Sequence, residues 1–215
     1  MEIAVIDYKM SNMFSIKNAL DSLGFESQIT SDQKKILKSD AAVLPGVGSF
    51  PEAMRHLNDL GLVEVIHEFI SSGKPFMGIC LGLQLLFTKS EEFNECGGLD
   101  IIKGNVEGFA KHLKGEPIPH VGWNKVINND LKQKKSGQTS KIIVDNNEYY
   151  YFVHSYFVKP DNIEDVYTLS RYGNFKFCSS IVNNNIFACQ FHPEKSGLKG
   201  LNILKNFFTK EINEV

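Results

Sequence analysis

The sequence predicts an α/β fold, with a mostly parallel central sheet flanked by helices and additional antiparallel strands in the C-terminal half. Two observations predict it. The first half alternates short apolar runs with longer stretches of helical periodicity, an order typical of parallel sheets. From about Gly97 the pattern changes to short strand-like runs in close succession, which indicates antiparallel pairing. With 215 residues, 42% of them hydrophobic, we expect one domain spanning residues 1–215.

Each element of the first half has a local reason. The apolar run at the N-terminus favours a strand, and the segment after it places apolar residues at helical spacing between a capping Ser11 and a terminating Gly24. The predicted elements are strand Glu2–Tyr8, helix Ser11–Leu23, strands Phe25–Thr30 and Ala41–Leu44, helical region Ser49–Ser72, strand Pro75–Cys80 and helix Leu81–Glu92.

In the second half, β-branched and aromatic residues between turn signals predict strands, and an apolar face predicts a closing helix. The elements are strands Leu99–Phe109, Val121–Ile127, Tyr149–Val158 and Val166–Tyr172, a hairpin of Phe175–Val182 and Ile186–Phe191 around Asn183–Asn185, and helix Gly197–Ile212. The polar segment Asp130–Lys141 is expected to be an exposed loop.

Composition excludes several function classes. The net charge is −2, and no stretch combines dense Lys and Arg with aromatics, so we expect no nucleic-acid partner. The longest apolar run, Phe76–Phe87, contains Gln84 and is too short to cross a bilayer, so we expect no membrane association. The four cysteines have neither a CxxC pair nor disulfide-rich spacing, which favours free thiols in a reducing cytoplasm. We expect no metal and no cofactor.

A cysteine between two glycines follows an apolar run in MGICLGLQL, residues 77–85. A nucleophile on a sharp strand-to-helix turn needs little bulk two residues to either side, and Gly78 and Gly82 meet that need around Cys80. The N-terminus of the following helix would favour a thiolate. The alternative is a buried structural cysteine beside glycines that allow close packing.

A proton carrier for such a thiolate is found in QFHPEKS. His192 ends a predicted strand, and Glu194 follows two positions later, so both side chains point the same way and the carboxylate can orient the imidazole. Taken alone, a surface pair is the simpler interpretation. His56, His67 and His112 lie in polar surroundings that indicate surface positions.

A third motif, PGVGSF at residues 45–50, follows the predicted strand Ala41–Leu44. Its flexible backbone can turn the N–H groups of Val47 or Gly48 toward an oxyanion, and Leu81, directly after the cysteine, offers another N–H. Taken alone, the motif equally predicts a tight strand-to-helix turn.

The three motifs together resemble the class I, triad-type glutamine amidotransferases, in order and approximate spacing over nearly the whole chain. Within that family, IPHVGWNKV (118–126) and YYFVHSYFV (150–158) resemble the glutaminase subunits of imidazole glycerol phosphate synthases. The resemblance implies that thiolate Cys80 attacks the glutamine side-chain amide, that His192 protonates the departing ammonia and that Glu194 holds the imidazole.

The resemblance also implies binding residues and a partner. Gln84 and Glu92, together with the strand residues His154, Ser155 and Tyr156, fall where the family binds L-glutamine. The ammonia would pass to a separate (β/α)8-barrel cyclase subunit that makes imidazole glycerol phosphate and an aminoimidazole carboxamide ribotide in histidine biosynthesis. The positions that match the partner interface are Asn12, Trp123, Tyr151 and Lys195.

One segment departs from the family pattern. DYKMSN has Lys9 and Ser11 where the family typically has glycines, although Asn12 matches. Because this loop lies toward the synthase partner in the family, the change affects the identity of the partner rather than glutamine hydrolysis. A related glutaminase that supplies a different barrel synthase, such as one modifying a surface sugar, is therefore an alternative.

Two further classes compete with this interpretation. A Cys-His protease or thioesterase would use a similar nucleophile, but the His-Pro-Glu order is not the orienting arrangement expected there. A regulatory scaffold would keep the fold and lose the chemistry, which the intact Cys80, His192 and Glu194 argue against.

Overall fold

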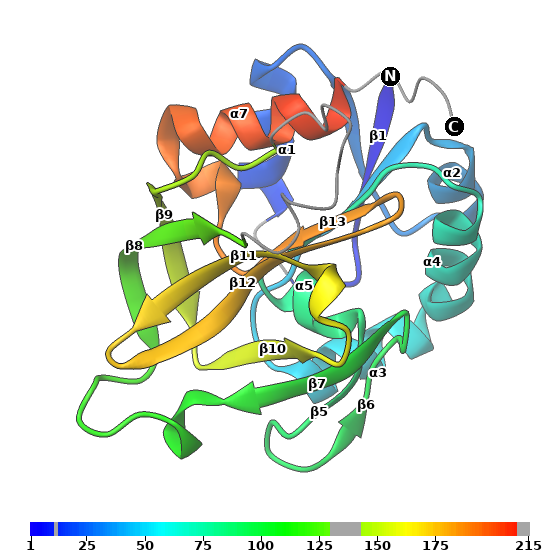
Figure 1. Ribbon diagram of the computed structural model, residues 1–215. Coiled ribbons are helices and arrows are strands. Elements are labelled where there is room, and N and C mark those ends of the chain that lie inside the picture. The colour runs from blue at the N-terminus through cyan, green and yellow to red at the C-terminus, as the bar shows by residue number, and fades with distance from the viewer. Residues whose placement is uncertain (11–12, 130–142, 210–215) are drawn as a thin grey trace.

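The computed structural model, which describes residues 1–10, 13–129 and 143–209, is built on one sheet of 13 strands (Figure 1). Its first part is parallel and runs in the order β2-β1-β3-β4-β13. These strands are β1 (Glu2–Ile6), β2 (Glu26–Thr30), β3 (Ala41–Leu44), β4 (Phe76–Ile79) and β13 (Ile186–Cys189). The predicted parallel α/β half is confirmed.

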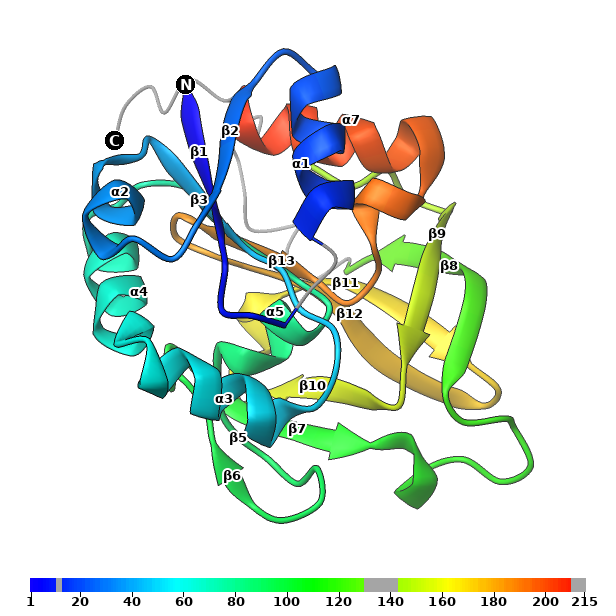
Figure 2. The same ribbon diagram turned by 180° about the vertical axis from the view of Figure 1, so that it is seen from behind.

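Helices cover both faces of the parallel strands, and the two sets lie on opposite sides in both views (Figures 1 and 2). The helices are α1 (Met13–Ser22), α2 (Gln33–Lys38), α3 (Phe50–Asp59), α4 (Leu62–Ser71), α5 (Leu81–Leu85) and α7 (Gly197–Phe208). Alternate residues of β1 belong to two hydrophobic cores. Ala4 and Ile6 pack on the side of α2, α3 and α4, whereas Ile3 and Val5 pack on the side of α1 and α7. Both faces of the strand are therefore apolar, as a doubly covered parallel strand requires.

Beyond β13 the sheet is mostly antiparallel and continues in the order β12-β10-β7-β5-β6, with a branch through β11, β8 and β9. These strands are β5 (Phe87–Ser90), β6 (Cys96–Gly97), β7 (Ile102–Gly108), β8 (His120–Asn128), β9 (Glu148–His154), β10 (Tyr156–Pro160), β11 (Val166–Tyr172) and β12 (Phe175–Asn183). The predicted change of pattern near Gly97 thus marks a real change of architecture.

The predicted helix Leu81–Glu92 is wrong over most of its length. Helix α5 ends after five residues, and the chain turns directly into β5, which pairs with β7 and β6. The carbonyl of Leu85 accepts the N–H of Leu99, and that of Leu86 accepts two further N–H groups. The return of the chain at Gly98–Ile102 therefore takes the carbonyls that a longer helix would need.

The structure differs from the predicted elements at three further points: two predicted elements are interrupted, and one helix was not predicted. The predicted helical region Ser49–Ser72 is two helices, α3 and α4, because Gly61 between them has a left-handed φ of 61°. The predicted strand Tyr149–Val158 is interrupted at Ser155 between β9 and β10. Helix α2 was not predicted, although Asp32 caps it by accepting the N–H of Lys35. The predicted loop Asp130–Lys141 lies outside the described residues.

Candidate active site

Cys80 occupies the sharp turn between β4 and α5, with φ 55° and ψ −109°. The two flanking glycines face each other across this turn, which we call the Cys80 turn (residues 78–82). A Cβ on Gly82 would lie 1.9 Å from the Leu44 oxygen, and one on Gly78 would lie 2.9 Å from the Gly82 oxygen. Both positions therefore require glycine for the close approach of strand and helix, as the sequence predicts.

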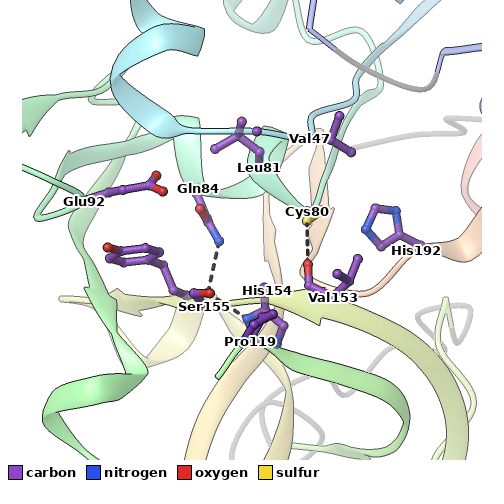
Figure 3. Close-up of a pocket in the computed structure, with 12 residues that line it drawn as sticks. Val47, Cys80, Leu81, Gln84, Glu92, Pro119, Val153, His154, Ser155 and His192 are labelled. Atoms are coloured by element: carbon purple, nitrogen blue, oxygen red, sulfur yellow. Dashed lines mark hydrogen bonds between the residues drawn. The ribbon is translucent and has the colours of Figure 1, made fainter. Parts of the chain in front are cut away.

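The parallel pairing of β4 with β13 brings His192 to Cys80. The Cys80 N–H donates to the Cys189 oxygen at 2.8 Å, so the segment after β13 runs beside the Cys80 turn. His192 continues that segment in extended conformation and lies next to Cys80 in Figure 3. Two residues that are far apart in the sequence thus become neighbours through one strand pair.

Glu194 orients the His192 ring. Its Oε1 lies 2.8 Å from His192 Nδ1, and both side chains are only 3% exposed. A carboxylate accepts, so Nδ1 carries the proton, while the buried Nε2 has no hydrogen-bond partner among the described residues. Burial opposes a charge on this ring, but the negative charges of Cys80 and Glu194 outweigh it and raise the pKa of His192 to about 10.

Besides His192, the described residues place two polar groups of opposite kind beside the sulfur. Gln190 Nε2 donates to Cys80 Sγ at 3.6 Å. The Val153 oxygen lies 3.8 Å from the sulfur as an acceptor for the thiol (Figure 3). The amide therefore favours a thiolate, and the carbonyl favours a thiol.

Val47 and Gly48, predicted as oxyanion donors, line the same cavity as Cys80 and Leu81. Gly48 has a φ of 98°, which an L residue rarely adopts. The first N–H that bonds within α5 is that of Leu83, so Leu81 sits at the helix start, where N–H groups have no intrahelical partner.

A cavity of about 270 Å³ joins the predicted residues (Figure 3). This volume is just below the range of about 300 to 1,000 Å³ typical of pockets for drug-sized ligands, so the cavity suits a smaller molecule. It is lined by Val47, Gly48, Cys80, Leu81, Gln84, Glu92, Pro119, Val153, His154, Ser155, Tyr156 and His192. Every predicted glutamine-binding residue is in this set, and Glu194 lies directly behind His192.

Two polar side chains at the far end of the cavity are held by backbone groups. Gln84 Nε2 donates to the Tyr156 oxygen at 3.1 Å, and Glu92 Oε2 accepts the N–H of Phe50 at 2.7 Å at the start of α3. Burial raises the pKa of the Glu92 carboxyl, and the bond from Phe50 partly offsets this rise. Glu92 thus combines a capping role with a place in the cavity wall.

The predicted interface residues lie outside this cavity. Trp123 on β8 is 57% exposed and contacts the half-buried Tyr151 on β9 edge to face, with ring centroids 6.3 Å apart. Lys195 is exposed beside Glu194. Asn12 lies outside the described residues.

Sequence reasoning missed four residues of the site. Pro119 and Val153 line the cavity, Gln190 contacts the sulfur and His120 supports His154. Of these four residues, only Gln190 could have been predicted from the sequence. It precedes His192 by two positions in an extended segment and so points the same way.

Within residues 1–10, 13–129 and 143–209, no group of three or more His, Cys, Asp or Glu side chains is placed to hold a metal ion. Over the same ranges, no helix has the length and apolar character needed to cross a membrane.

Known sequences match this chain over nearly its whole length. The sequence model of the family "Glutamine amidotransferase class-I" matches residues 4–211. The chain is 49% identical over 205 residues to the imidazole glycerol phosphate synthase subunit HisH of Caldanaerobacter subterraneus subsp. tengcongensis, covering 95% of this chain and 96% of that protein. It is 46% identical over 211 residues to the protein of the same name from Aquifex aeolicus, covering 98% and 97%.

Solved structures share the fold at low sequence identity. A crystal structure of a glutamine amidotransferase superposes with a TM-score of 0.71 at 16% identity, covering 96% of each chain. The structure of PurLQS from Thermotoga maritima superposes with a TM-score of 0.69 at 18% identity, covering 96% of this chain and 97% of that one.

Proposed function

Because the chain belongs to the class I glutamine amidotransferase family, we propose that it is the glutaminase subunit of an imidazole glycerol phosphate synthase. It hydrolyses L-glutamine to glutamate and ammonia at Cys80. The observation that carries this proposal is the cavity in which Cys80, on its glycine-flanked turn, meets His192 and Glu194. The high identity to synthase subunits over nearly the whole chain supports the choice of synthase.

The first half of the reaction transfers the acyl group to sulfur. The Cys80 thiolate attacks the carbon of the glutamine carboxamide and forms a tetrahedral oxyanion. The N–H of Leu81 and one from Val47 or Gly48 stabilise that oxyanion, a contact worth about 3 to 4 kcal/mol per donor in other enzymes. The C–N bond then breaks as His192, charged at neutral pH because of its raised pKa, gives the Nε2 proton to the leaving nitrogen.

The second half releases glutamate. His192, now neutral, takes a proton from water as the water oxygen attacks the thioester, and the C–S bond breaks to restore the thiolate. Glu194 keeps the ring in one tautomer and stabilises its charged form throughout.

Gln84 and Glu92 bind the substrate in this proposal. The Glu92 carboxylate suits the α-ammonium of glutamine. Gln84 donates its N–H groups to the Tyr156 and Gln190 oxygens, so its own oxygen is left to accept an N–H of the substrate. His154, Ser155 and Tyr156 form the facing wall at the break between β9 and β10.

The ammonia passes to a partner, which we take to be a (β/α)8-barrel cyclase subunit in the cytoplasm. Ammonia released to water is diluted and protonated, so a docked synthase is needed to use it. The outer face of β8 and β9 supports docking, because Val121, Trp123 and Tyr149 are each more than half exposed there. Lys195, exposed beside Glu194, extends this face toward the site.

The test measures the glutaminase rate of this chain alone, with a barrel subunit from histidine biosynthesis, and with that subunit plus its nucleotide ligand. We expect a slow basal rate, stimulation by docking and further stimulation by the ligand. Cys80→Ser should remove turnover in all three conditions while leaving complex formation intact. If a sugar-modifying barrel synthase stimulated the rate instead, the protein would be assigned to the pathway of that synthase.

The same protein preparation also tests the competing function classes. Peptide and ester substrates probe a protease or thioesterase, and hydrolysis of these without hydrolysis of glutamine would overturn the proposal. Absence of turnover with a bound, liganded partner would indicate a regulatory scaffold.

A further inference from the structure

A series of hydrogen bonds leads through Gln84 and Gln190 to the Cys80 sulfur. Gln190 Nε2 donates to Cys80 Sγ at 3.6 Å, and Gln190 Oε1 accepts from Gln84 Nε2 at 3.0 Å. Gln84 Nε2 also donates to the Tyr156 oxygen at 3.1 Å. Gln190 is completely buried, so its amide has no access to water as an alternative partner.

The Tyr156 carbonyl fixes which way both amides point. A carbonyl oxygen only accepts, so the Gln84 atom that faces it must be the NH2 group. That same NH2 group faces Gln190, which must therefore present its oxygen to Gln84. The Gln190 NH2 group is then the one that faces the sulfur, and it donates rather than accepts.

A pair of buried histidines holds the carbonyl in place. His154 Nδ1 donates to the Tyr156 oxygen at 2.7 Å, and His154 Nε2 lies 3.0 Å from His120 Nδ1. Burial lowers the pKa of His154 to about 3 and that of His120 to about 4, so both rings are neutral at neutral pH. Each ring then has one donor and one acceptor, and His120 Nε2 accepts from Asn124 Nδ2 at 3.2 Å. Every member of the series has one orientation.

The other neighbours of the sulfur do not replace this donor. Three of the described groups interact electrostatically with Cys80: His192 carries a positive charge, whereas Tyr8 and Cys189 do not. The Val153 oxygen, 3.8 Å away, favours the neutral thiol. Gln190 is thus the neutral donor that opposes the effect of Val153.

We propose that Gln190 is a positioning residue whose amide N–H holds the Cys80 sulfur and stabilises it as a thiolate. The proposal rests on the proposed role of Cys80 as the nucleophile. Gln190 touches no substrate atom in it and acts only through the sulfur.

The experiment measures the alkylation rate of Cys80 by iodoacetamide as a function of pH, followed by mass spectrometry of the peptide that contains Cys80. In Gln190→Met, which keeps the length of the side chain and removes the donor, the midpoint should rise by about one pH unit, with about tenfold slower alkylation at pH values well below both midpoints. In Gln190→Glu the rise should be at least as large, because a carboxylate repels the thiolate.

Thr168→Val is the matched control. Thr168 is buried on β11 and bonds Ser179 and Ser180, so this variant removes buried hydrogen bonds in the same sheet without touching the sulfur. Its alkylation midpoint should equal that of the parent. A shift as large as that of Gln190→Met would show that general loosening of the sheet, not the lost donor, moves the midpoint.

An unchanged midpoint in Gln190→Met would overturn the proposal. If that variant does not fold, as judged by circular dichroism, Gln190→Leu, which also removes the donor without adding a charge, decides in the same way. Because alkylation needs no glutamine, the two proposals fail separately: a parent chain without glutaminase activity contradicts the proposed function, whereas an unshifted midpoint contradicts only the role of Gln190.

Discussion

Two glycine-rich turns meet at the proposed site, and the backbone constrains them to different degrees. The Cys80 turn follows β4, and the PGVGSF segment follows the neighbouring β3. In the Cys80 turn, an added Cβ at either glycine would meet backbone atoms at 1.9 or 2.9 Å. Backbone lies on both sides, so no flexible side chain can move to make room.

The PGVGSF segment is constrained at its start and open beyond it. A Cβ on Gly46 would lie 2.7 Å from Leu81 Cβ and 2.9 Å from the Gly82 nitrogen, whereas the nearest atom to one on Gly48 is the flexible end of Met10. Val47 between them is 40% exposed. The sulfur is therefore placed by a rigid turn, whereas the peptide proposed to bind the oxyanion lies in a segment with room to rotate. Partner docking can shift such a segment between two backbone states.

Among single substitutions, the largest effect on stability is expected from Gly82→Ala. Its Cβ would overlap the Leu44 oxygen, so strand and helix must separate, and we expect the free energy of unfolding to fall by about 3 kcal/mol or more. Urea unfolding at pH 7 measures the change. A loss under about 1 kcal/mol would show that the Cys80 turn adapts, and the contrast with PGVGSF would disappear.

A second prediction concerns the cavity wall opposite the Cys80 turn, which hydrogen bonds rather than close contacts hold in place. The pKa of His120 is lowered to about 4 and that of His154 to about 3, so below about pH 6.5 the unfolded chain binds protons that the folded chain does not. Stability should therefore fall as the pH drops from 6.5 toward 4, by up to about 1.4 kcal/mol per pH unit for each histidine.

Urea unfolding between pH 7 and pH 5 tests this slope. The raised pKa of His192 has the opposite sign and acts at higher pH, because the stability it contributes is present below 6.5 and is lost as the pH rises toward 10. The variant His120→Gln/His154→Gln should be less stable and should lose most of the acid slope. An unchanged slope would show that the two rings take up protons without unfolding.

The third prediction compares two variants of Cys80, the proposed nucleophile. Cys80 has a φ of 55° and a ψ of −109°, which costs a residue with a Cβ energy that glycine avoids. Cys80→Gly should therefore be more stable than Cys80→Ala by about 1 to 2 kcal/mol, although neither should hydrolyse glutamine. Equal unfolding midpoints would mean that the turn stores no strain at this position.

Gly48→Ala should have the smallest effect on stability. With a φ of 98°, alanine should cost about 1 kcal/mol, because the end of Met10 can move aside. Restricting the Val47–Gly48 peptide should nevertheless lower the ratio of partner-stimulated to basal glutaminase rate. A normal ratio would contradict rotation of this segment as the basis of stimulation.

The sequence predicts those parts of the site that local pattern determines. The glycines around Cys80 indicate the turn, and the spacing of His192 and Glu194 indicates their bond of 2.8 Å. The alternation of strand and helix likewise predicts the parallel half, because each element there is a separate periodic segment.

What the sequence did not predict depends on contacts between distant segments. Helix α5 ends where the segment Gly98–Ile102 hydrogen-bonds to its last carbonyls, and nothing in the apolar run Leu81–Phe87 indicates this end. The break at Ser155 separates two strands of similar composition that join different partners, β8 and β7. Gln190 acquires its role only through Gln84 and the Tyr156 carbonyl, from two other elements of the fold.

The pairing of β13 with β4 also has a consequence for folding. Cys80 and His192 lie more than 100 residues apart in the sequence, and the bond from the Cys80 N–H to the Cys189 oxygen joins the two segments. Contacts of such long sequence separation form late, because they close a large loop. During synthesis the thiol therefore lacks the histidine proposed as its proton carrier until almost the whole chain has emerged. Chemical reactivity of Cys80 is then a probe of complete folding, distinct from any signal of secondary structure.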